Sequence, residues 1–227
     1  FLLRDLATPQ GGFASALDAD TDGVEGLTYA WTPAQLIEVL GEADGRWAAE
    51  QLEVTREGTF EHGASTLQRL LEPDDLDRYH RVRTLLWQSR EQRPQPGRDD
   101  KVVAAWNGLA AAALAEAGVL LNRPDYTAAA VRCIDLVRTL HWVEGRLRRL
   151  SRDGVVGRHL AVLEDYADVA EGLIAVYSAT GDLDQLRGAH ALLEVVLAEF
   201  ADGNGGFFDT AADAHHLEPL IRRPQDP

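Results

Sequence analysis

The sequence predicts an all-α fold in which paired helices surround a more buried inner set, an α/α toroid or a related solenoid of helical repeats. After Lys101, the next twenty residues contain only two that are charged or strongly polar, Asn107 and Glu116. A helix that is apolar on every side is expected to be enclosed by other helices. Short links at residues 122–124 and at Gly181 are expected to join antiparallel helices.

A faint internal repeat also favours this fold class. Three times, at residues 11–13, 144–147 and 205–207, a glycine-containing turn meets an apolar residue after the expected end of a helix. A loop then leads to the next helix. Long loops would therefore join successive helix pairs, which is the arrangement of a toroid or solenoid.

The first hundred residues are expected to be mixed. Residues 1–6 are the tail of a helix that ends before Thr8-Pro9, and the alternation at residues 27–31 predicts a short strand. Thr32 to Gln35 form a capping box with proline at the first helical position, which predicts a helix start. The expected helical apolar residues are Leu36, Ile37, Leu40 and then Trp47, Ala48 and Leu52 of a second helix, before an irregular loop at residues 55–65.

The remaining elements are expected to be longer helices. Asp74 or Asp75 caps a helix with apolar residues at three- and four-residue steps, and the proline-rich residues 93–97 end it. Amphipathic helices are then predicted at about 125–140, 164–179 and 183–200, with a β-hairpin or ordered loop at 145–158.

Composition excludes several classes of partner. The chain has 227 residues and a formal charge of −15, which argues against nucleic-acid binding and against anionic membrane surfaces. Cys133 is the only cysteine, so no internal disulfide can form, and this fits a reducing compartment. No targeting segment is visible, and we predict a cytoplasmic protein that forms part of a longer chain.

Asp99, Asp100 and Lys101 precede the apolar helix. They could supply an acid/base pair tuned by a neighbouring cation, with Asp100 as the catalytic group, or one aspartate could simply cap the helix. Trp106 and Asn107 follow. An aromatic face and an amide suit a sugar ring and its hydroxyls, while the alternative is a core tryptophan and a satisfied buried amide.

Glu164, Asp165 and Tyr166 begin a second expected inner helix. In a toroid they would lie at the same end as Asp100, so that Asp100, Glu164 and Asp165 form the candidate catalytic set and Tyr166 a binding residue. Paired carboxylates can protonate a glycosidic oxygen and activate water, whereas epimerisation needs an acid and a base, often histidine. Compensation of the helix dipole is the structural alternative for both acids.

Other polar groups have weaker patterns. Asp18, Asp20 and Asp22-Gly23 match the first half of a calcium loop, but Tyr29 stands where the last ligand would be. With Glu25, Asp18 and Asp20 are instead expected to line the cleft or shape the loop.

His62 and His159 are the histidines considered for a base; His141, His190, His215 and His216 are assigned to helix ends or the surface. Five arginines could form a solvated face or a clamp for an anionic sugar: Arg146, Arg148, Arg149, Arg152 and Arg158.

Several stretches of the chain form a recognisable set: residues 11–20, Glu25-Gly26 and 29–31, residues 99–101 with 105–109, and residues 163–167, 205–210 and 223–227. Together they resemble the helical part of the thioredoxin-domain-containing YyaL family, whose animal relative is spermatogenesis-associated protein 20. These stretches occur in the family's order and span nearly the whole chain.

The resemblance implies one partial domain over residues 1–227. Its fold would be a six-hairpin (α/α) toroid similar to the N-acylglucosamine 2-epimerases and helical-barrel glycosidases, an incomplete ring with short β-hairpins in its loops. An upstream thioredoxin-like domain is expected in the parent chain. By analogy with the fold, we expect a carbohydrate-active protein, a sugar epimerase or glycoside hydrolase, acting on a small carbohydrate without a cofactor or metal. The expected binding residues are Asp18, Asp20, Glu25, Lys101, Trp106, Asn107 and Tyr166. The rival hypothesis is a non-catalytic module that presents a substrate or partner to the thioredoxin-like domain.

Overall fold

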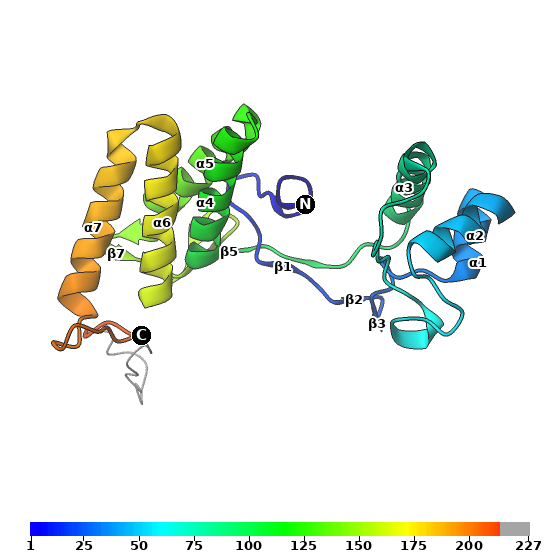
Figure 1. Ribbon diagram of the computed structural model, residues 1–227. Helices are drawn as coiled ribbons and strands as arrows, with labels where there is room; N and C mark the ends of the chain where they lie inside the picture. The colour runs from blue at the N-terminus through cyan, green and yellow to red at the C-terminus, as the bar shows by residue number, and fades with distance from the viewer. Residues whose placement is uncertain (214–227) are drawn as a thin grey trace. The chain divides into compact units, whose positions relative to one another are not determined.

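A computed structural model describes residues 1–213 of the chain. The expected motif at residues 223–227 and the His215-His216 pair lie outside the described residues. The chain divides into two compact units, one formed by residues 1–16 and 98–213 and the other by residues 17–97 (Figure 1). Each unit has its own buried core, and each is described by itself below.

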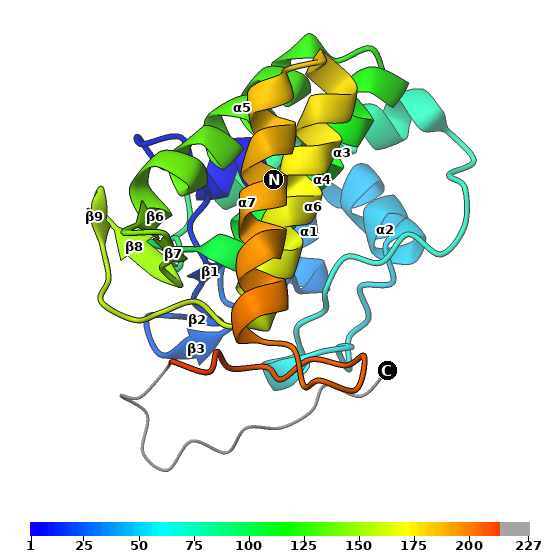
Figure 2. The same ribbon diagram turned by 90° about the vertical axis from the view of Figure 1, so that its left-hand side faces the viewer.

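The larger unit is built on two helical hairpins. α4 (Ala104–Leu120) and α5 (Pro124–Leu136) form the first, and α6 (Leu163–Thr180) and α7 (Leu183–Glu199) form the second. α5 runs on into a π-helical turn, η3 (Val137–His141). The links between the helices of each pair are short, as the sequence predicts. Figures 1 and 2 show α4 next to α6, with α5 and α7 packed on them.

α4 and α6 run parallel, with their N-termini at the same end. The backbone N–H of Ala105 donates to Asp165 Oδ1 at 3.2 Å, which joins the first turns. One turn further along, Gly108 lies against the backbone of Asp168, and Gly172 lies against the carbonyl of Gly108. A Cβ at either glycine would collide with backbone, so both must stay without a side chain. Parallel inner helices backed by antiparallel outer ones are the repeating unit of an (α/α) toroid.

The predicted internal repeat is present at the turns. An antiparallel pairing closes each one: Ala7 with Phe13, Trp142 with Leu147, and Ala201 with Phe207. The first follows the π-helical turn η1 (Leu2–Leu6), the second follows η3, and the third follows α7. The repeat predicted from the sequence is therefore also a repeat in the structure.

Short strands occupy the loops of the larger unit, as expected. β6 (Trp142–Val143) pairs with β7 (Arg146–Leu147). β8 (Leu150–Arg152) lies between β5 (Lys101–Val103) and β9 (Val155–Val156), both antiparallel to it. β5 therefore leads directly into α4 while held to the loop that leads into α6. At the boundary between the units lie β1 (Ala16–Leu17) and β4 (Arg98–Asp99).

The smaller unit holds three helices and a hairpin within residues 17–97: α1 (Pro33–Leu40), α2 (Glu42–Gln51) and α3 (Leu76–Glu91). The predicted capping box at Thr32 and Gln35 is present, and Asp75 rather than Asp74 caps α3. Residues 55–65 form a loop with one 3₁₀ turn, η2 (Glu61–Gly63). The core of the smaller unit contains Trp31, Leu36, Ala48, Leu52, Val54, Val82 and Leu86.

The predicted strand at residues 27–31 is wrong. Tyr29 and Ala30 both donate backbone N–H groups to the carbonyl of Gly26, so this segment is a turn, and Trp31 alone pairs with Ser65. Trp31 is buried, and the Arg93 guanidinium lies 3.7 Å from the centroid of its ring. The strands of this region lie earlier, at β2 (Asp20–Thr21) and β3 (Val24–Glu25).

The predicted all-α class, with paired helices of the toroid type and short hairpins in the loops, is confirmed. A helix with the length and apolar character needed to cross a membrane does not occur among residues 1–213.

Candidate functional site

The site expected at the start of the two inner helices is organised by Asp165. Its side chain is fully buried, and both oxygens are used: Oδ1 accepts from Ala105 N, while Oδ2 accepts from Val162 N at 3.0 Å and from Arg149 Nη1 at 3.1 Å. Burial raises the pKa of Asp165, while the Val162 N–H and the Arg149 charge act in the opposite direction. Asp165 thus caps its own helix and a second helix at once.

Asn107 is equally occupied. Its Oδ1 accepts from Phe13 N at 2.7 Å, and its Nδ2 donates to Phe13 O at 3.1 Å and to Val103 O at 2.9 Å. The thiol of Cys133 lies 3.2 Å from the same Oδ1. The amide is buried and its hydrogen-bonding capacity is taken up by the protein, which is the satisfied-amide alternative rather than a group aimed at a ligand.

Tyr166 is also buried, and its hydroxyl accepts from Leu147 N at 2.9 Å and from Arg146 Nε at 3.3 Å. Its ring packs on Phe200, with centroids 5.3 Å apart. Of the predicted binding residues, Asn107 and Tyr166 therefore hold the loops in place.

Trp106 is half exposed, at 51%, so the core-tryptophan alternative is wrong. The expectation that α4 is enclosed on all sides also fails within the larger unit, because Trp106 and Leu109 lie on a face of α4 that no described helix of that unit covers. α6 has a corresponding exposed face that includes Glu164, Glu171 and Ile174. We refer to these five residues, together with Asp168, as the α4/α6 face.

Asp168 is the acid that the sequence reading missed. It lies one turn after Glu164 on α6 and one turn before Glu171, half-buried where α6 meets Gly108 of α4. Burial and the negative charges of Glu164, Glu171 and Asp165 raise the pKa of Asp168 to about 6. The spacing of three acids at steps of four and three could have identified it, because those positions share one side of a helix.

Asp99, Asp100 and Lys101 do not lie at the helix start. Asp99 ends β4, Lys101 begins β5, and α4 begins only at Ala104, after Val103. The prediction that one of these aspartates caps α4 is wrong, because β5 separates them from the helix and Asp165 takes that role. Lys101 Nζ is 2.9 Å from Asp99 Oδ2 and holds the pKa of Asp99 below its usual value, and Arg98 Nε donates to Asp100 Oδ1 at 2.6 Å.

Asp18, Asp20 and Glu25 belong to the smaller unit. Asp20 pairs with Glu25 across the β2–β3 hairpin, which turns at Asp22-Gly23 with positive φ at both residues. This turn geometry explains the glycine and the aspartate without a calcium ion. Within residues 1–213, no group of three or more His, Cys, Asp or Glu side chains is placed to hold a metal ion.

The arginine-rich loop is tied to the protein rather than open to a ligand. Arg149 joins Asp165 and lies 3.8 Å from Glu164, and Arg146 pairs with Asp213 as well as with Tyr166. Arg148 Nη1 donates to Arg158 O at 3.0 Å. Of these arginines, Arg149 thus braces the start of α6 and, through Asp165, the start of α4.

His141 lies at a helix end, as predicted, because it is the last residue of η3, and its ring is fully buried. Its Nδ1 donates to Arg148 O at 3.0 Å and its Nε2 lies 2.8 Å from Ser151 Oγ. Burial lowers the pKa of His141. His62 and His159 both lie exposed on the surface.

Comparison with curated proteins confirms the resemblance read from the sequence. The chain is homologous to spermatogenesis-associated protein 20 of Rattus norvegicus (29% identity) and of Homo sapiens (28%), over 100% of this chain in both cases. An uncharacterised protein of Caenorhabditis elegans is 26% identical over 93% of the chain. The chain spans 35% of the length of each of these relatives. No protein-family model matches it.

Two solved structures are similar in fold. One is a sugar epimerase from a ruminal bacterium, with a TM-score of 0.42 and 13% identity over 88% of this chain and 52% of that one. The other is cellobiose 2-epimerase from Bacillus thermoamylovorans, with a TM-score of 0.45 and 11% identity over 89% of this chain and 53% of that one.

Proposed function

Starting from the homology to spermatogenesis-associated protein 20, we propose that the α4/α6 face binds a small carbohydrate and processes it by carboxylate acid/base chemistry, as a sugar epimerase or glycoside hydrolase would. The observation that carries this proposal is the position of Asp168, half-buried one helical turn from the exposed Glu164 and Glu171, where burial and the neighbouring charges raise its pKa to about 6. A general acid or base works best when its pKa lies near the operating pH. An ordinary surface aspartate, which titrates near 3.8, would hold no proton to give.

The environment of Asp168 separates the roles of the acids. Glu164 and Glu171 are exposed to solvent, whereas Asp168 is half-buried against α4. Burial and the charges of the two glutamates raise the pKa of Asp168 to about 6, so this carboxyl can serve as the acid while a glutamate serves as base or nucleophile. Neighbouring carboxyl groups with separated pKa values are how many enzymes divide these two tasks.

Trp106 supplies the apolar part of the proposed site. Its indole is half exposed on α4, at the same end of the parallel pair as Glu164, and could stack on the apolar side of a sugar ring. Among the other predicted residues, Asp165 acts in this proposal as a positioning residue that fixes the start of both helices. Asp100, Lys101, Asp18, Asp20 and Glu25 stay predicted contributors, and the Asp100→Asn variant below tests the first of them.

The test is turnover of neutral, amino and uronic sugars by the longest natural chain that carries this sequence. Asp168→Asn is expected to lower kcat by about 10²–10⁴-fold, the range typical for loss of a general acid or base. Glu164→Gln and Asp100→Asn are assayed beside it, with Glu194→Gln on the outer helix α7 as a control of equal charge change. The pH profile of kcat/KM is expected to show a limb near pH 6 that is missing in Asp168→Asn. Equal activity of Asp168→Asn and Glu194→Gln would contradict the proposal.

One observation favours the alternative of a partner-binding module. Leu109 and Ile174 are 46% and 42% exposed on the same face, which is more apolar surface than a sugar requires. In that case the parent chain is expected to capture a defined client protein. The capture is expected to be lost in Leu109→Asp or Ile174→Asp and to be unchanged in Asp168→Asn. Sugar turnover that depends on Asp168 would decide against it.

A further inference from the structure

The two hairpins of the larger unit are successive copies of one repeat. Ala104 and Leu163, the first residues of the inner helices, are fifty-nine positions apart in the chain. The same step relates His141 to Phe200, which are fully buried and close the outer helices. Each position of the first hairpin therefore has a counterpart in the second. Because the second hairpin covers the first, the covered positions of the first mark where a following hairpin would contact the second.

Two residues of the first hairpin show how it is covered. On α4, Gly108 lies against the backbone of Asp168. On α5, the Ile134 side chain packs against α6 at Gly172, where an added Cβ would be 3.0 Å from Ile134 Cδ1. Both Gly108 and Ile134 are buried. The inner and the outer helix of the first hairpin thus both contact α6.

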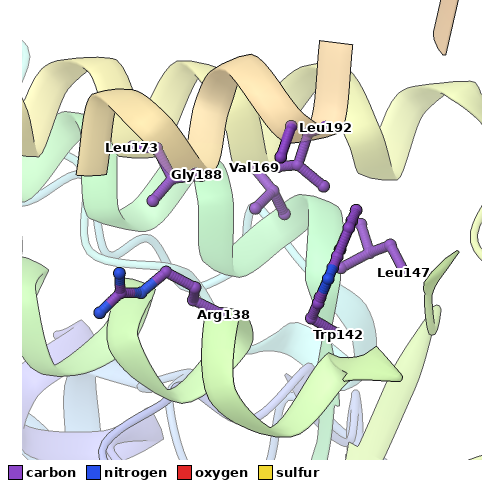
Figure 3. A pocket seen from close by; sticks show the side chains of 8 residues that line it. Arg138, Trp142, Leu147, Val169, Leu173, Gly188 and Leu192 are labelled. Atoms are coloured by element: carbon purple, nitrogen blue, oxygen red, sulfur yellow. The ribbon is translucent and has the colours of Figure 1, made fainter. Parts of the chain in front are cut away.

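Figure 3 shows the outer part of this contact. Arg138 of η3 and Gly188 of α7 line an apolar cavity there, from the first and the second hairpin respectively. The other labelled side chains around it are those of Trp142, Leu147, Val169, Leu173 and Leu192. The outer helices of successive repeats therefore also pack side by side.

The counterparts of the covered positions are exposed on the second hairpin. Ala167 on α6 stands where α4 has Gly108, and it is exposed rather than buried. Leu193 on α7 stands where α5 has Ile134, and its exposed fraction is 42% instead of 0%. Leu197, one turn further along α7, is 59% exposed. Within the larger unit, no described element covers Ala167, Leu193 and Leu197.

A polar group beside the second hairpin also lacks a partner. Arg149 O and Asp209 O each accept, at 2.9 Å, from the backbone N–H that begins an inner helix, α4 and α6 respectively, so these two residues are equivalent. The Arg149 side chain donates to Asp165 on the following inner helix. Asp209 Oδ1 is buried and makes no hydrogen bond within the described part of the chain. A buried acceptor without a donor costs free energy, which a donor on a following inner helix would recover.

We propose that the side of the second hairpin that carries Ala167, Leu193 and Leu197 binds a third helical hairpin, supplied by the parent chain beyond residue 227. The inner helix of this hairpin runs parallel to α6, as α6 runs parallel to α4, and approaches it most closely at Ala167. Its first turn brings a hydrogen-bond donor to Asp209 Oδ1. Its outer helix packs beside α7 over Leu197.

Three observations favour a hairpin of the same chain as the occupant. The last repeat of a helical array needs a polar outer face to stay in water, whereas this side exposes Leu193 and Leu197. Two copies of the chain would repel each other, since each carries a formal charge of −15. The curated relatives are long enough to hold further repeats, because this chain spans only 35% of their length.

The test uses the longest natural chain that carries this sequence, with photoreactive benzoylphenylalanine in place of Leu193. After irradiation, mass spectrometry identifies the peptide joined to position 193. The expected main product is a crosslink within one molecule to a segment that follows residue 227. The control places the same group at Ala198, which is exposed on α7 and whose counterpart Thr139 is exposed in the first hairpin, so this crosslink is expected to be absent. A main crosslink to another part of residues 1–227, to a second copy of the chain, or to no peptide would overturn the proposal.

Two milder variants of the same chain keep the test valid if the photoreactive group disturbs the fold. Leu193→Gln is expected to lower the melting temperature by several degrees more than Ala198→Gln, because apolar surface buried under the third hairpin loses its contacts. Asp209→Ala is expected to lower the melting temperature if a donor binds Oδ1, and to leave it unchanged or raise it if the oxygen stays without a partner. Equal melting temperatures of the two glutamine variants, or an Asp209→Ala no less stable than the wild type, would contradict the proposal.

Discussion

Asn107 and Tyr166 occupy the same position in two successive repeats. Each is the fourth residue of an inner helix, α4 or α6, and each accepts a hydrogen bond from the backbone N–H of the residue that closes a glycine turn, Phe13 or Leu147. Two different side chains therefore perform one task. Each bond therefore fixes a glycine turn against the start of an inner helix.

Tyr166→Phe tests that bond with little change in packing. The ring contact with Phe200 is retained, but the N–H of Leu147, in a buried residue, loses its acceptor. We expect the free energy of unfolding to fall by about 1–2 kcal/mol, measured by urea unfolding. Tyr177→Phe on the same helix is the matched control. A loss no larger than that of the control would show that the hydroxyl contributes nothing to stability.

Asn107→Asp changes one atom of the other member of the pair. The new oxygen would face the carbonyls of Phe13 and Val103, which now accept from Nδ2, and a charge would be buried. We expect a loss of about 3 kcal/mol or more in the free energy of unfolding at pH 7, with partial recovery at low pH as the acid becomes protonated. A stability equal to wild type, or no dependence on pH, would contradict the assigned contacts.

Asp165→Asn and Asp100→Asn separate a structural acid from a surface one. Asp165 is fully buried with an arginine partner, so its neutralisation is expected to cost about 2–4 kcal/mol of unfolding free energy. Asp100 pairs with Arg98 at a partly exposed site, where such pairs contribute about 0–1 kcal/mol. Calorimetry or urea unfolding of both variants checks the order. Equal losses would mean that Asp165 does not hold the two helix starts together.

The buried imidazole of His141 predicts a loss of stability in mild acid. Because burial lowers its pKa in the folded state, the unfolded chain binds the proton more readily, and the free energy of unfolding falls as pH drops below about 6.5. In His141→Gln this part of the pH dependence is expected to disappear, although the variant starts from a lower stability at pH 7. Urea unfolding at pH 7, 6 and 5 provides the slope. If the wild type and His141→Gln show the same slope, the pH dependence of stability in this range comes from other groups.

Asp168 predicts the opposite trend. Its pKa is raised to about 6, so its ionised form is unfavourable in the folded state at neutral pH, and this cost is relieved as pH falls through 6 toward 3.8. Asp168→Asn is expected to gain about 1 kcal/mol at pH 7, a value reduced from the full shift because the group is partly exposed, and little at pH 4.5. Glu194→Gln is the control. If Asp168→Asn were less stable than the wild type at pH 7, the ionised Asp168 carboxylate would not be unfavourable in the folded state.

The sequence predicts most of the helices because their signals are local. Thr32 and Gln35 cap a helix whatever surrounds them, and the apolar period of residues 164–179 is visible in the chain itself. Asp99 and Asp100 show the limit of this reasoning: the donor set they were expected to satisfy is satisfied by Asp165, sixty positions after Ala105. The exposure of Trp106 and the raised pKa of Asp168 likewise depend on which helices lie next to α4 and α6, which no local pattern reveals.

The reach of Asp165 has a consequence for the order of folding. When α4 emerges from the ribosome, neither Asp165, the acceptor for the Ala105 N–H, nor Arg149, which holds this acceptor in place, has yet emerged. The first hairpin therefore completes its start only after residues 149–165 have been synthesised and have reached it. Until then, the Ala105 N–H at the start of α4 lacks its acceptor. A chaperone would meet this incomplete helix start, and a premature stop before Asp165 would leave it incomplete.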